Sequence, residues 1–446
     1  MIAAWLWLAC QPCIESPCTA GNVDARVRGP YPSELGNALA VQGDAVIAGA
    51  TRFASPDVPR GRLHAFVGHY DRRSLRERGR WVGESTFDET GHAVAGHTLL
   101  DGQRLWAFGQ PAHDTASTNG AVRLLHELPS GQEEADRVAN LTVTGPYWAQ
   151  LGNALAFVEH PELGLELWIG SYGHPPVSEE EDPTFRGRLY AVGVDERGTL
   201  GEGDVRRVIF GPGFGFARRF TTWDADRDGV DDLITITRPE VTDEALVAFR
   251  GPWVAARQEA PPPDGSWTLA PGSVFGDNLE ATADLTGDGW PDLIVGAYTF
   301  DGPGQVMVLE SGPDALGEGP LEERAWLVLT DEWAPSRLGV SLAAGDLDGD
   351  GAVDLVVGDA GPVRLAGFST LGRILVFLGP LSAGTLTPAD ADIELFGPSY
   401  GAEFARALVL APGDDGPDLF VGSPDAEGLR GEIVRISAAR LLELAR

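Results

Sequence analysis

Short apolar runs that end in glycine and a small residue recur along this chain. Examples are VIAGA at 46–50, LIVGA at 293–297, LVVGD at 355–359 and LFVGS at 419–423. Runs of four to eight apolar and β-branched residues, bounded by turns, are typical of buried β-strands. The hydrophobic pattern therefore predicts an all-β fold made of many short strands.

A glycine-containing turn precedes each run and divides the chain into seven related units. The glycines of these turns are Gly36, Gly91, Gly152, Gly215, Gly276, Gly339 and Gly401. Successive glycines are 55, 61, 63, 61, 63 and 62 residues apart. Self-similarity at a nearly fixed period indicates a repeat architecture.

Each unit contains about four segments that resemble strands, which is the content of one β-propeller blade. We therefore expect a seven-bladed β-propeller of about 60-residue repeats over residues 24–436. Its blades would start near residues 31, 86, 147, 210, 271, 334 and 396. A linear solenoid is the alternative, but it would need polar caps at its ends.

The two ends of the repeat region complement each other. The last unit stops after its third segment, GEIVRIS at 431–437, whereas ARVRGP at 25–30 resembles a fourth segment without a unit of its own. We expect residues 24–30 to complete the last blade and close the ring. The tail at 437–446 is rich in helix formers and predicts one or two helical turns.

Three nine-residue loops carry oxygen side chains at positions 1, 3, 5 and 9: DADRDGVDD at 224–232, DLTGDGWPD at 284–292 and DLDGDGAVD at 346–354. Oxygens at alternate positions of a curled loop can converge on one point, and Ca²⁺ takes six to eight oxygen ligands. Position 7 would supply a backbone carbonyl, and glycine at position 6 would permit the turn. The predicted calcium ligands are Asp224, Asp226, Asp228, Val230, Asp232, Asp284, Thr286, Asp288, Trp290, Asp292, Asp346, Asp348, Asp350, Ala352 and Asp354.

The loops differ from an EF-hand, which requires a glutamate at position 12 and flanking helices. Position 12 is Thr235, Val295 or Val357, and the flanking segments resemble strands. We expect about three Ca²⁺ sites, in blades four to six; acidic surface turns without an ion are the alternative. The corresponding segment of the last unit, at 410–420, lacks the first two acidic positions, so we expect no ion there.

The leading Phe-Gly or Leu-Gly, the DxDxDGxxD loop and the closing Gly-Ala together resemble the FG-GAP repeat of integrin alpha subunits and their bacterial relatives. The resemblance covers roughly residues 24–436. It implies a seven-bladed propeller in which calcium loops stiffen one face while the other face binds ligands. No stalk or membrane span follows the repeats, so a signalling receptor is not implied.

Charge restricts the class of partner. The chain has 33 basic and 66 acidic residues and a formal net charge of -33. A field of this sign repels nucleic acid and anionic membrane surfaces. A protein or carbohydrate ligand at a propeller face is therefore the predicted partner.

The amino terminus, residues 1–20, resembles a truncated signal or lipoprotein leader followed by a cysteine-containing tether. Residues 2–9 are apolar but too short to span a bilayer, and Leu8-Ala9-Cys10 resembles the end of a lipoprotein signal. A lipid anchor at Cys10 would leave Cys13 and Cys18 as a pair, as an exported protein favours. The predicted location is extracytoplasmic, either secreted or as a surface lipoprotein.

No paired catalytic motif is present. Ser399 in GPSYG has the spacing of a nucleophile elbow but lies in a repeat turn, and the histidines, such as His92, His113, His160 and His174, are scattered over the first three units. We therefore expect a noncatalytic binding or adhesion module. A hydrolase or lyase with carboxylates at the central channel is the alternative, and a purely structural envelope protein is a third possibility. The insertion at 173–187, with its acidic run Glu179–Asp182, is the first place to look for a ligand site.

Overall fold

The structure is a computed structural model that describes most of the chain after residue 22. The described residues are 23–30, 33–51, 65–83, 88–114, 118–146, 149–160, 162–172, 186–213, 215–237, 244–269, 273–299, 303–331, 336–365, 368–397, 403–414, 416–426 and 430–444. The leader with its three cysteines, most of the insertion at 173–187 with His174, and Ser399 lie outside them.

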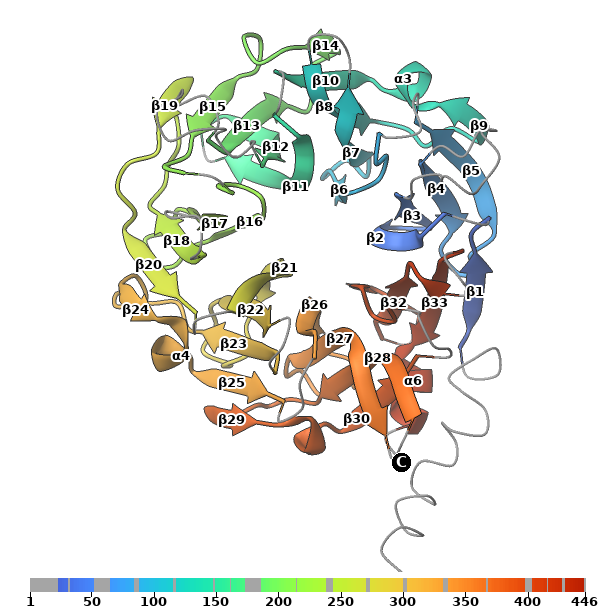
Figure 1. Cartoon of the computed structure of the whole chain (residues 1–446), viewed down its shortest axis with the longest axis vertical. Coiled ribbons are helices and arrows are strands. Elements are labelled where there is room, and N and C mark those ends of the chain that lie inside the picture. Colours follow the sequence, from blue (N-terminus) through green and yellow to red (C-terminus); the bar gives the residue numbers. More distant parts are fainter. Residues whose placement is uncertain are drawn as a thin grey trace, which may run out of the picture.

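The described strands form six hydrogen-bonded sheets arranged around a ring, and no sheet closes on itself (Figure 1). The first sheet has the order β2 (Leu35–Gln42), β3 (Ala45–Ala50), β4 (Phe66–Asp71), β5 (Glu77–Val82) and β9 (Gly131–Glu134). The second, ten-stranded sheet contains β6 (Val94–Thr98), β7 (Arg104–Asp114), β8 (Thr118–Leu125), β10 (Leu141–Pro146), β11 (Leu151–His160), β12 (Gly164–Ser171), β13 (Arg188–Gly193), β14 (Gly198–Leu200), β15 (Arg207–Phe210) and β19 (Arg257–Glu259).

Four further sheets follow in chain order. The third sheet contains β16 (Phe220–Trp223), β17 (Asp232–Thr237), β18 (Ala245–Phe249), β20 (Gly265–Thr268) and β24 (Glu318–Pro320). The fourth contains β21 (Ser273–Ala283), β22 (Asp292–Thr299), β23 (Gln305–Leu309), β25 (Leu327–Thr330) and β29 (Gly384–Leu386). The fifth contains β26 (Leu338–Gly345), β27 (Asp354–Leu365), β28 (Phe368–Phe377) and β30 (Ile393–Phe396), and the sixth contains β31 (Ala407–Ala411), β32 (Asp418–Ser423), β33 (Glu432–Ser437) and β1 (Ala25–Arg28).

Helices are few and short: α3 (Ala135–Val138), α4 (Leu321–Arg324), α6 (Ala438–Leu444) and a 3-10 turn at Pro388–Asp390. The all-β prediction is confirmed. Among the described helices none is long and apolar enough to cross a membrane.

The ten-stranded sheet divides into two antiparallel groups, β6-β7-β8-β10 and β11-β12-β13-β15. They are joined by a single parallel pair, Leu151 with Gly120. With this division, each of the seven sequence units supplies one group of antiparallel strands, and the C-terminal group takes its fourth strand from β1.

Five groups also receive a short fifth strand from the unit that follows in sequence. The strands β9, β14, β19, β24 and β29 pair in parallel with β5, β10, β15, β20 and β25, respectively. Sequence analysis did not predict them, because three or four polar residues such as GQEE at 131–134 carry no strand periodicity. They tie each outer strand to the next unit.

The hydrophobic core lies between neighbouring groups and consists of seven apolar clusters. One cluster packs Ile294 and Val306 against Leu355 and Leu375, and so joins the fourth and fifth sheets. Another packs Leu35 and Val46 of the first sheet against Phe420 and Ile433 of the last. Each group therefore buries both of its faces.

Strand β1 lies where the sequence predicts a strand, at the outer side of the last group. It pairs antiparallel with β33, from Ala25 opposite Arg435 to Arg28 opposite Glu432. The Nε atoms of Arg26 and Arg28 lie 3.3 Å from the Glu432 carboxylate. The tail forms α6, which contacts β33 and β30.

Neighbouring groups approach so closely near the ring axis that glycine backbone contacts glycine backbone. A Cβ atom on Gly49 would lie 1.9 Å from the carbonyl oxygen of Gly91, the leading glycine of the next unit, which has a φ of +85°. The same contact joins the last unit to the first, because a Cβ atom on Gly422 would lie 2.0 Å from the oxygen of Gly36. Any side chain at these positions would force the groups apart.

We predict that Gly422→Ala destabilises the protein. Overpacking of this kind lowers the free energy of unfolding by about 1–3 kcal/mol, so thermal unfolding should occur at a lower temperature. Gly203→Ala is the matched control, because its Cβ atom would meet nothing within 4 Å; it should change stability by no more than about 0.5 kcal/mol. Equal stability of the two variants would contradict the close contact.

Candidate metal centres

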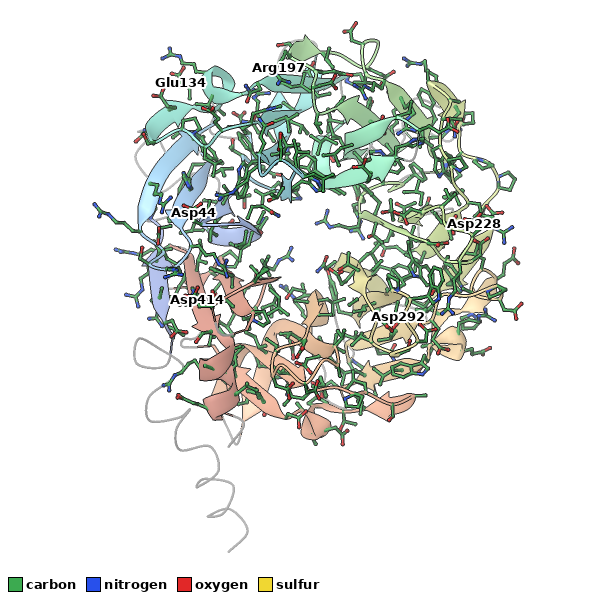
Figure 2. The ribbon with its side chains drawn as sticks, turned by 180° about the vertical axis from the view of Figure 1, so that it is seen from behind. Asp44, Glu134, Arg197, Asp228, Asp292 and Asp414 are labelled. Carbon is green, nitrogen blue, oxygen red and sulfur yellow. The ribbon has the colours of Figure 1, made fainter. Side chains whose placement is uncertain are left out.

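The three acidic loops occupy equivalent places in three consecutive groups. Each connects the strand nearest the ring axis to the next strand: β16 to β17, β21 to β22 and β26 to β27. The ninth-position residues Asp232, Asp292 and Asp354 are the first residues of β17, β22 and β27, and all three are buried. Asp228 and Asp292 label the first two loops on neighbouring sheets in Figure 2.

The carboxylate at position 1 holds each loop in its curl. Asp224 accepts hydrogen bonds from the amides of Asp228 and Gly229, at 3.0 and 3.1 Å. Asp346 accepts them from Gly349 and Gly351, at 2.7 and 3.0 Å. The glycine at position 6 has a φ of 87° to 93° in the three loops, as the sequence spacing anticipates.

Two loops bring three carboxylates together. Oxygens of Asp224, Asp226 and Asp228 lie within 4.8 Å of one another, as do oxygens of Asp346, Asp348 and Asp354. Such clusters have the donor set that Ca²⁺ prefers.

One predicted carboxylate ligand of each of these loops lies outside its three-membered cluster and accepts hydrogen bonds from amides, as the clustered Asp228 and Asp354 also do. Asp232 accepts hydrogen bonds from Ala225 at 3.2 Å and Gly251 at 3.0 Å. Asp350 accepts one from Ala352 at 2.7 Å. At position 7, the amides of Val230 and Trp290 donate to Asp228 and Asp288, at 2.8 and 3.0 Å. The role of the position-7 carbonyls as ligands stays a prediction.

The second loop differs, and within the described part of the chain its carboxylates do not form such a three-membered cluster. Asp288 forms an ion pair with Arg227, which belongs to the first loop. The guanidinium of Arg227 also lies over the Trp290 ring, 5.4 Å from its centroid, and bonds Ser311 at 3.0 Å. Thr286 lies 3.4 Å from both Asp284 and Asp292. A site here would need Asp288 to leave Arg227.

The electrostatics of the clusters favour a bound positive charge. Burial, reinforced by the charges of Asp226 and Asp228, raises the pKa of Asp232 to about 7. Burial and the charge of Asp284 raise the pKa of Asp292 to about 6. In the third loop the pKa of Asp354 is also raised, by burial and then by its acidic neighbours. A cation at these points would remove that repulsion.

In the last unit, arginine side chains contact the aspartate that corresponds to the ninth position of the loops. Asp418 begins β32, as Asp232 begins β17, but its carboxylate is bound by two guanidinium groups. Arg435 contributes two contacts of 3.0 Å, and Arg72 of the first unit contributes one of 3.1 Å. In the last unit the aspartate that begins the second strand is thus paired with arginine.

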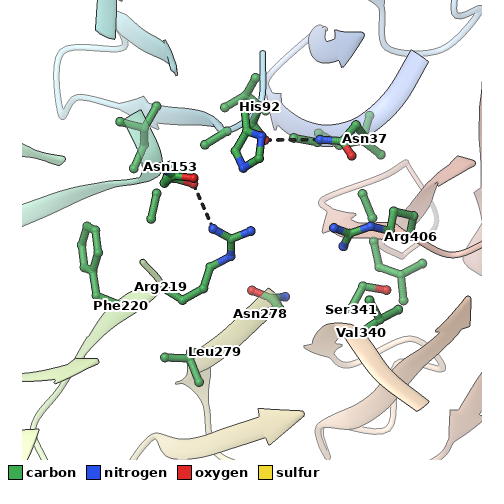
Figure 3. Close-up of a pocket in the computed structure, with 18 residues that line it drawn as sticks. Asn37, His92, Asn153, Arg219, Phe220, Asn278, Leu279, Val340, Ser341 and Arg406 are labelled. Atoms are coloured by element: carbon green, nitrogen blue, oxygen red, sulfur yellow. Dashed lines mark hydrogen bonds between the residues drawn. The ribbon is translucent and has the colours of Figure 1, made fainter. Parts of the chain in front are cut away.

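A cavity of about 230 Å³ lies on the ring axis and is lined by residues from the strands nearest the axis (Figure 3). None of the site residues predicted from the sequence lines this cavity; His92, which does, was predicted only as one of the scattered histidines. Its two arginines, Arg219 and Arg406, come from turns that the motif analysis treated only as repeat landmarks. Local sequence gave no signal that these turns would face one another.

Comparisons with known proteins agree with the repeat pattern. The FG-GAP-like repeat family matches residues 284–357, which include the second loop and the third loop. Human integrin alpha-7 is 36% identical over 160 residues, covering 34% of this chain and 12% of that protein. Human phosphatidylinositol-glycan-specific phospholipase D is 32% identical over 155 residues, covering 33% of this chain and 18% of that protein.

Two further comparisons extend this. Integrin alpha-PS2 of Drosophila melanogaster is 32% identical over 173 residues, 34% of this chain and 12% of that protein. The extracellular domains 1-2 of Drosophila Semaphorin 1b superpose with a TM-score of 0.46 at 11% identity, covering 93% of this chain and 86% of that one. This chain thus spans less than a fifth of the length of these integrins and of the human phospholipase. The FG-GAP-like repeat is thus matched over one stretch of the chain, and about a third of the chain is similar to integrin alpha subunits and to a phospholipase D.

Proposed function

We propose that this protein is a noncatalytic, calcium-binding β-propeller that binds a protein or carbohydrate ligand outside the cytoplasm. The observation that carries the calcium part is the convergence of three carboxylates in the first loop and again in the third. Similarity to integrin alpha subunits supports an adhesion-type role and an extracytoplasmic location. A lipid anchor at Cys10 remains part of the proposal.

We further infer that the seven groups of strands are the blades of a closed seven-bladed propeller. Support comes from the seven apolar clusters, one of which joins the last sheet to the first, and from the pairing of β1 with β33. The contact between Gly422 and Gly36 repeats the contact between consecutive units such as Gly49 and Gly91.

Calcium suits the loops better than magnesium. All candidate ligands are oxygens, and the loops curl without a rigid octahedral cage, as Ca²⁺ with its six to eight ligands tolerates. A bound ion would fix the end of the strand nearest the axis to the start of its neighbour. Asp226 of the first loop also pairs with an arginine, Arg250, at 2.8 Å. The second loop, whose described carboxylates form no three-membered cluster and whose Asp288 pairs with Arg227, is nevertheless the one for which we predict the weakest site.

A hydrolase or lyase with carboxylates at the channel is less well supported. Among the described residues that line the axial cavity there is no aspartate or glutamate. The similarity to a phospholipase D covers 18% of that enzyme, so its activity is not carried over. The noncatalytic interpretation therefore stays the proposal.

We predict that calcium raises the thermal stability of the protein relative to chelator. Saturation at a hundredfold over Kd stabilises by about 2.7 kcal/mol for each independent site. The triple variant Asp228→Ala, Asp288→Ala and Asp350→Ala should lose most of this rise. Asp414→Ala, in the last unit, is the control and should keep it. An unchanged calcium response in the triple variant would refute the three loops as sites.

The first loop should bind calcium more weakly in acid. Asp232 is mostly protonated at pH values below its pKa of about 7. Because Ca²⁺ binds the ionised carboxylate, protons compete with the ion. In a variant with only the first loop intact (Asp288→Ala and Asp350→Ala), the apparent Kd should be roughly 30-fold higher at pH 5.5 than at pH 8. Calorimetric titration measures this directly. A Kd independent of pH would show that Asp232 is not a ligand.

A further inference from the structure

The axial cavity has a positive lining in a strongly acidic protein. The chain carries a formal net charge of -33. Among the described residues that line the cavity, the ionisable ones are Arg219, Arg406 and His92. Figure 3 shows the side chains of Arg219 and Arg406, from the turns before β16 and β31, extending toward the space at the centre.

The guanidinium of Arg219 is held in place by backbone. Its Nη1 atom donates to the carbonyl oxygens of Asn153 and Arg218, at 3.1 and 2.8 Å. Arg406 lies in a turn, and its backbone amide donates to the carbonyl oxygens of Glu403 and Gly422, both at 3.1 Å. These contacts fix the guanidinium of Arg219 and the backbone of Arg406.

In two units an alanine, Ala217 or Ala405, takes the structural place that the leading glycine has in other units, two and four residues after Gly215 and Gly401. Arg219 lies two residues after Ala217, and Arg406 directly follows Ala405. Ala217 and Ala405 have φ values of 58° and 66°, a region that residues other than glycine rarely adopt. A Cβ atom on Gly170 would lie 2.1 Å from the carbonyl oxygen of Ala217, and one on Gly358 would lie 2.6 Å from that of Ala405. These contacts correspond to the contact between Gly49 and the oxygen of Gly91. The two units that depart from the repeat at this point are thus the two that place arginine in the cavity.

The remaining lining suits a ligand with polar groups around an acidic one. Three amides, Asn37, Asn153 and Asn278, and the hydroxyl of Ser341 line the cavity together with apolar side chains such as Leu155 and Phe220. Amides both donate and accept hydrogen bonds. A volume of about 230 Å³ lies below the usual range of roughly 300–1,000 Å³ for drug-sized ligands.

We propose that the axial cavity binds a small oxyanion-bearing ligand, such as an acidic sugar, with its carboxylate or sulfate between Arg219 and Arg406. Guanidinium groups bind such oxyanions through paired, charge-assisted hydrogen bonds. The inference rests on the proposed binding function and specifies the charge and size of its ligand.

The cavity lies away from the metal loops along the same strands. Asn278 is near the middle of β21, and that strand ends one residue before Asp284. At about 3.3 Å per residue, the two points are roughly 20 Å apart. Calcium and the oxyanion would therefore occupy separate sites.

The test uses three probes on one sugar frame: galacturonate, galactose 6-sulfate and galactose. Ligand-observed NMR at 0.15 M salt, where the Debye length is about 8 Å, reports local rather than long-range charge. We expect at least one acid to bind at least tenfold more tightly than galactose. Carboxylate and sulfate are distinguished by which acid binds more tightly. Equal binding of all three probes, or binding of none, would overturn the proposal.

Variants test whether the arginines form the site. Arg219→Gln with Arg406→Gln should weaken binding of the acid at least tenfold, and Asn37→Asp, nearly isosteric, should do the same by adding a negative charge. Asn37 donates only a long bond of 3.4 Å to His92, so this variant should fold normally. Arg137→Ala, an exposed arginine paired with Glu134, is the control and should bind as the wild type does.

The outcomes separate this inference from the proposed function. Calcium-dependent stability of each variant shows that the ring and its loops are intact. Acid binding that persists in the folded double variant, or in folded Asn37→Asp, would overturn the cavity as the site while the calcium proposal stands.

Discussion

The close backbone contact between neighbouring units is the constraint on which the rest of this structure depends. Gly49 against Gly91, and Gly422 against Gly36, leave no room for a side chain. Because the groups converge there, the strands nearest the axis are fixed relative to one another, and the larger apolar residues pack farther out between the sheets. These glycines are therefore required for packing, and Gly36 and Gly91, with positive φ, for turn geometry as well.

The excess carboxylates have different partners in different parts of the fold. All 33 basic residues are arginines, whose planar groups can bind carboxylates bidentately. Asp418 is bound by Arg72 and Arg435, and Arg373 is buried with Asp331 and Asp359. Among the described residues, groups of three carboxylates close enough to hold a metal ion occur in the first and third acidic loops, where we propose a cation as their partner. The axial cavity differs, because two arginines line it and its described lining contains no aspartate or glutamate.

Much of the fold could be predicted from the sequence, because its signals are local and repeated. The apolar runs gave the strands, and the mismatch between GEIVRIS and ARVRGP indicated the pairing of β33 with β1. The tail at 437–446 is helical over Ala438–Leu444. Loop spacing likewise indicated carboxylates that converge in the first and third loops, although Asp232 and Asp350 lie outside the three-membered clusters.

What could not be predicted depends on contacts between distant segments. The pairing of Arg72 with Asp418 spans 346 residues, and that of Arg227 with Asp288 joins two loops. The short fifth strands have no periodic pattern of apolar residues. Arg219 and Arg406 line the same cavity only because the ring brings their units together. Such features follow from the arrangement of the groups around the ring rather than from any local pattern.

The claim that cations brace three of the strands nearest the axis is tested most directly by hydrogen exchange with and without calcium. We expect calcium to slow amide exchange at least tenfold at 220–232, 279–292 and 342–354. Exchange at 39–45 and 158–164, which belong to units without acidic loops, should not change. Equal slowing in all units, or none in the three loops, would contradict local bracing by calcium.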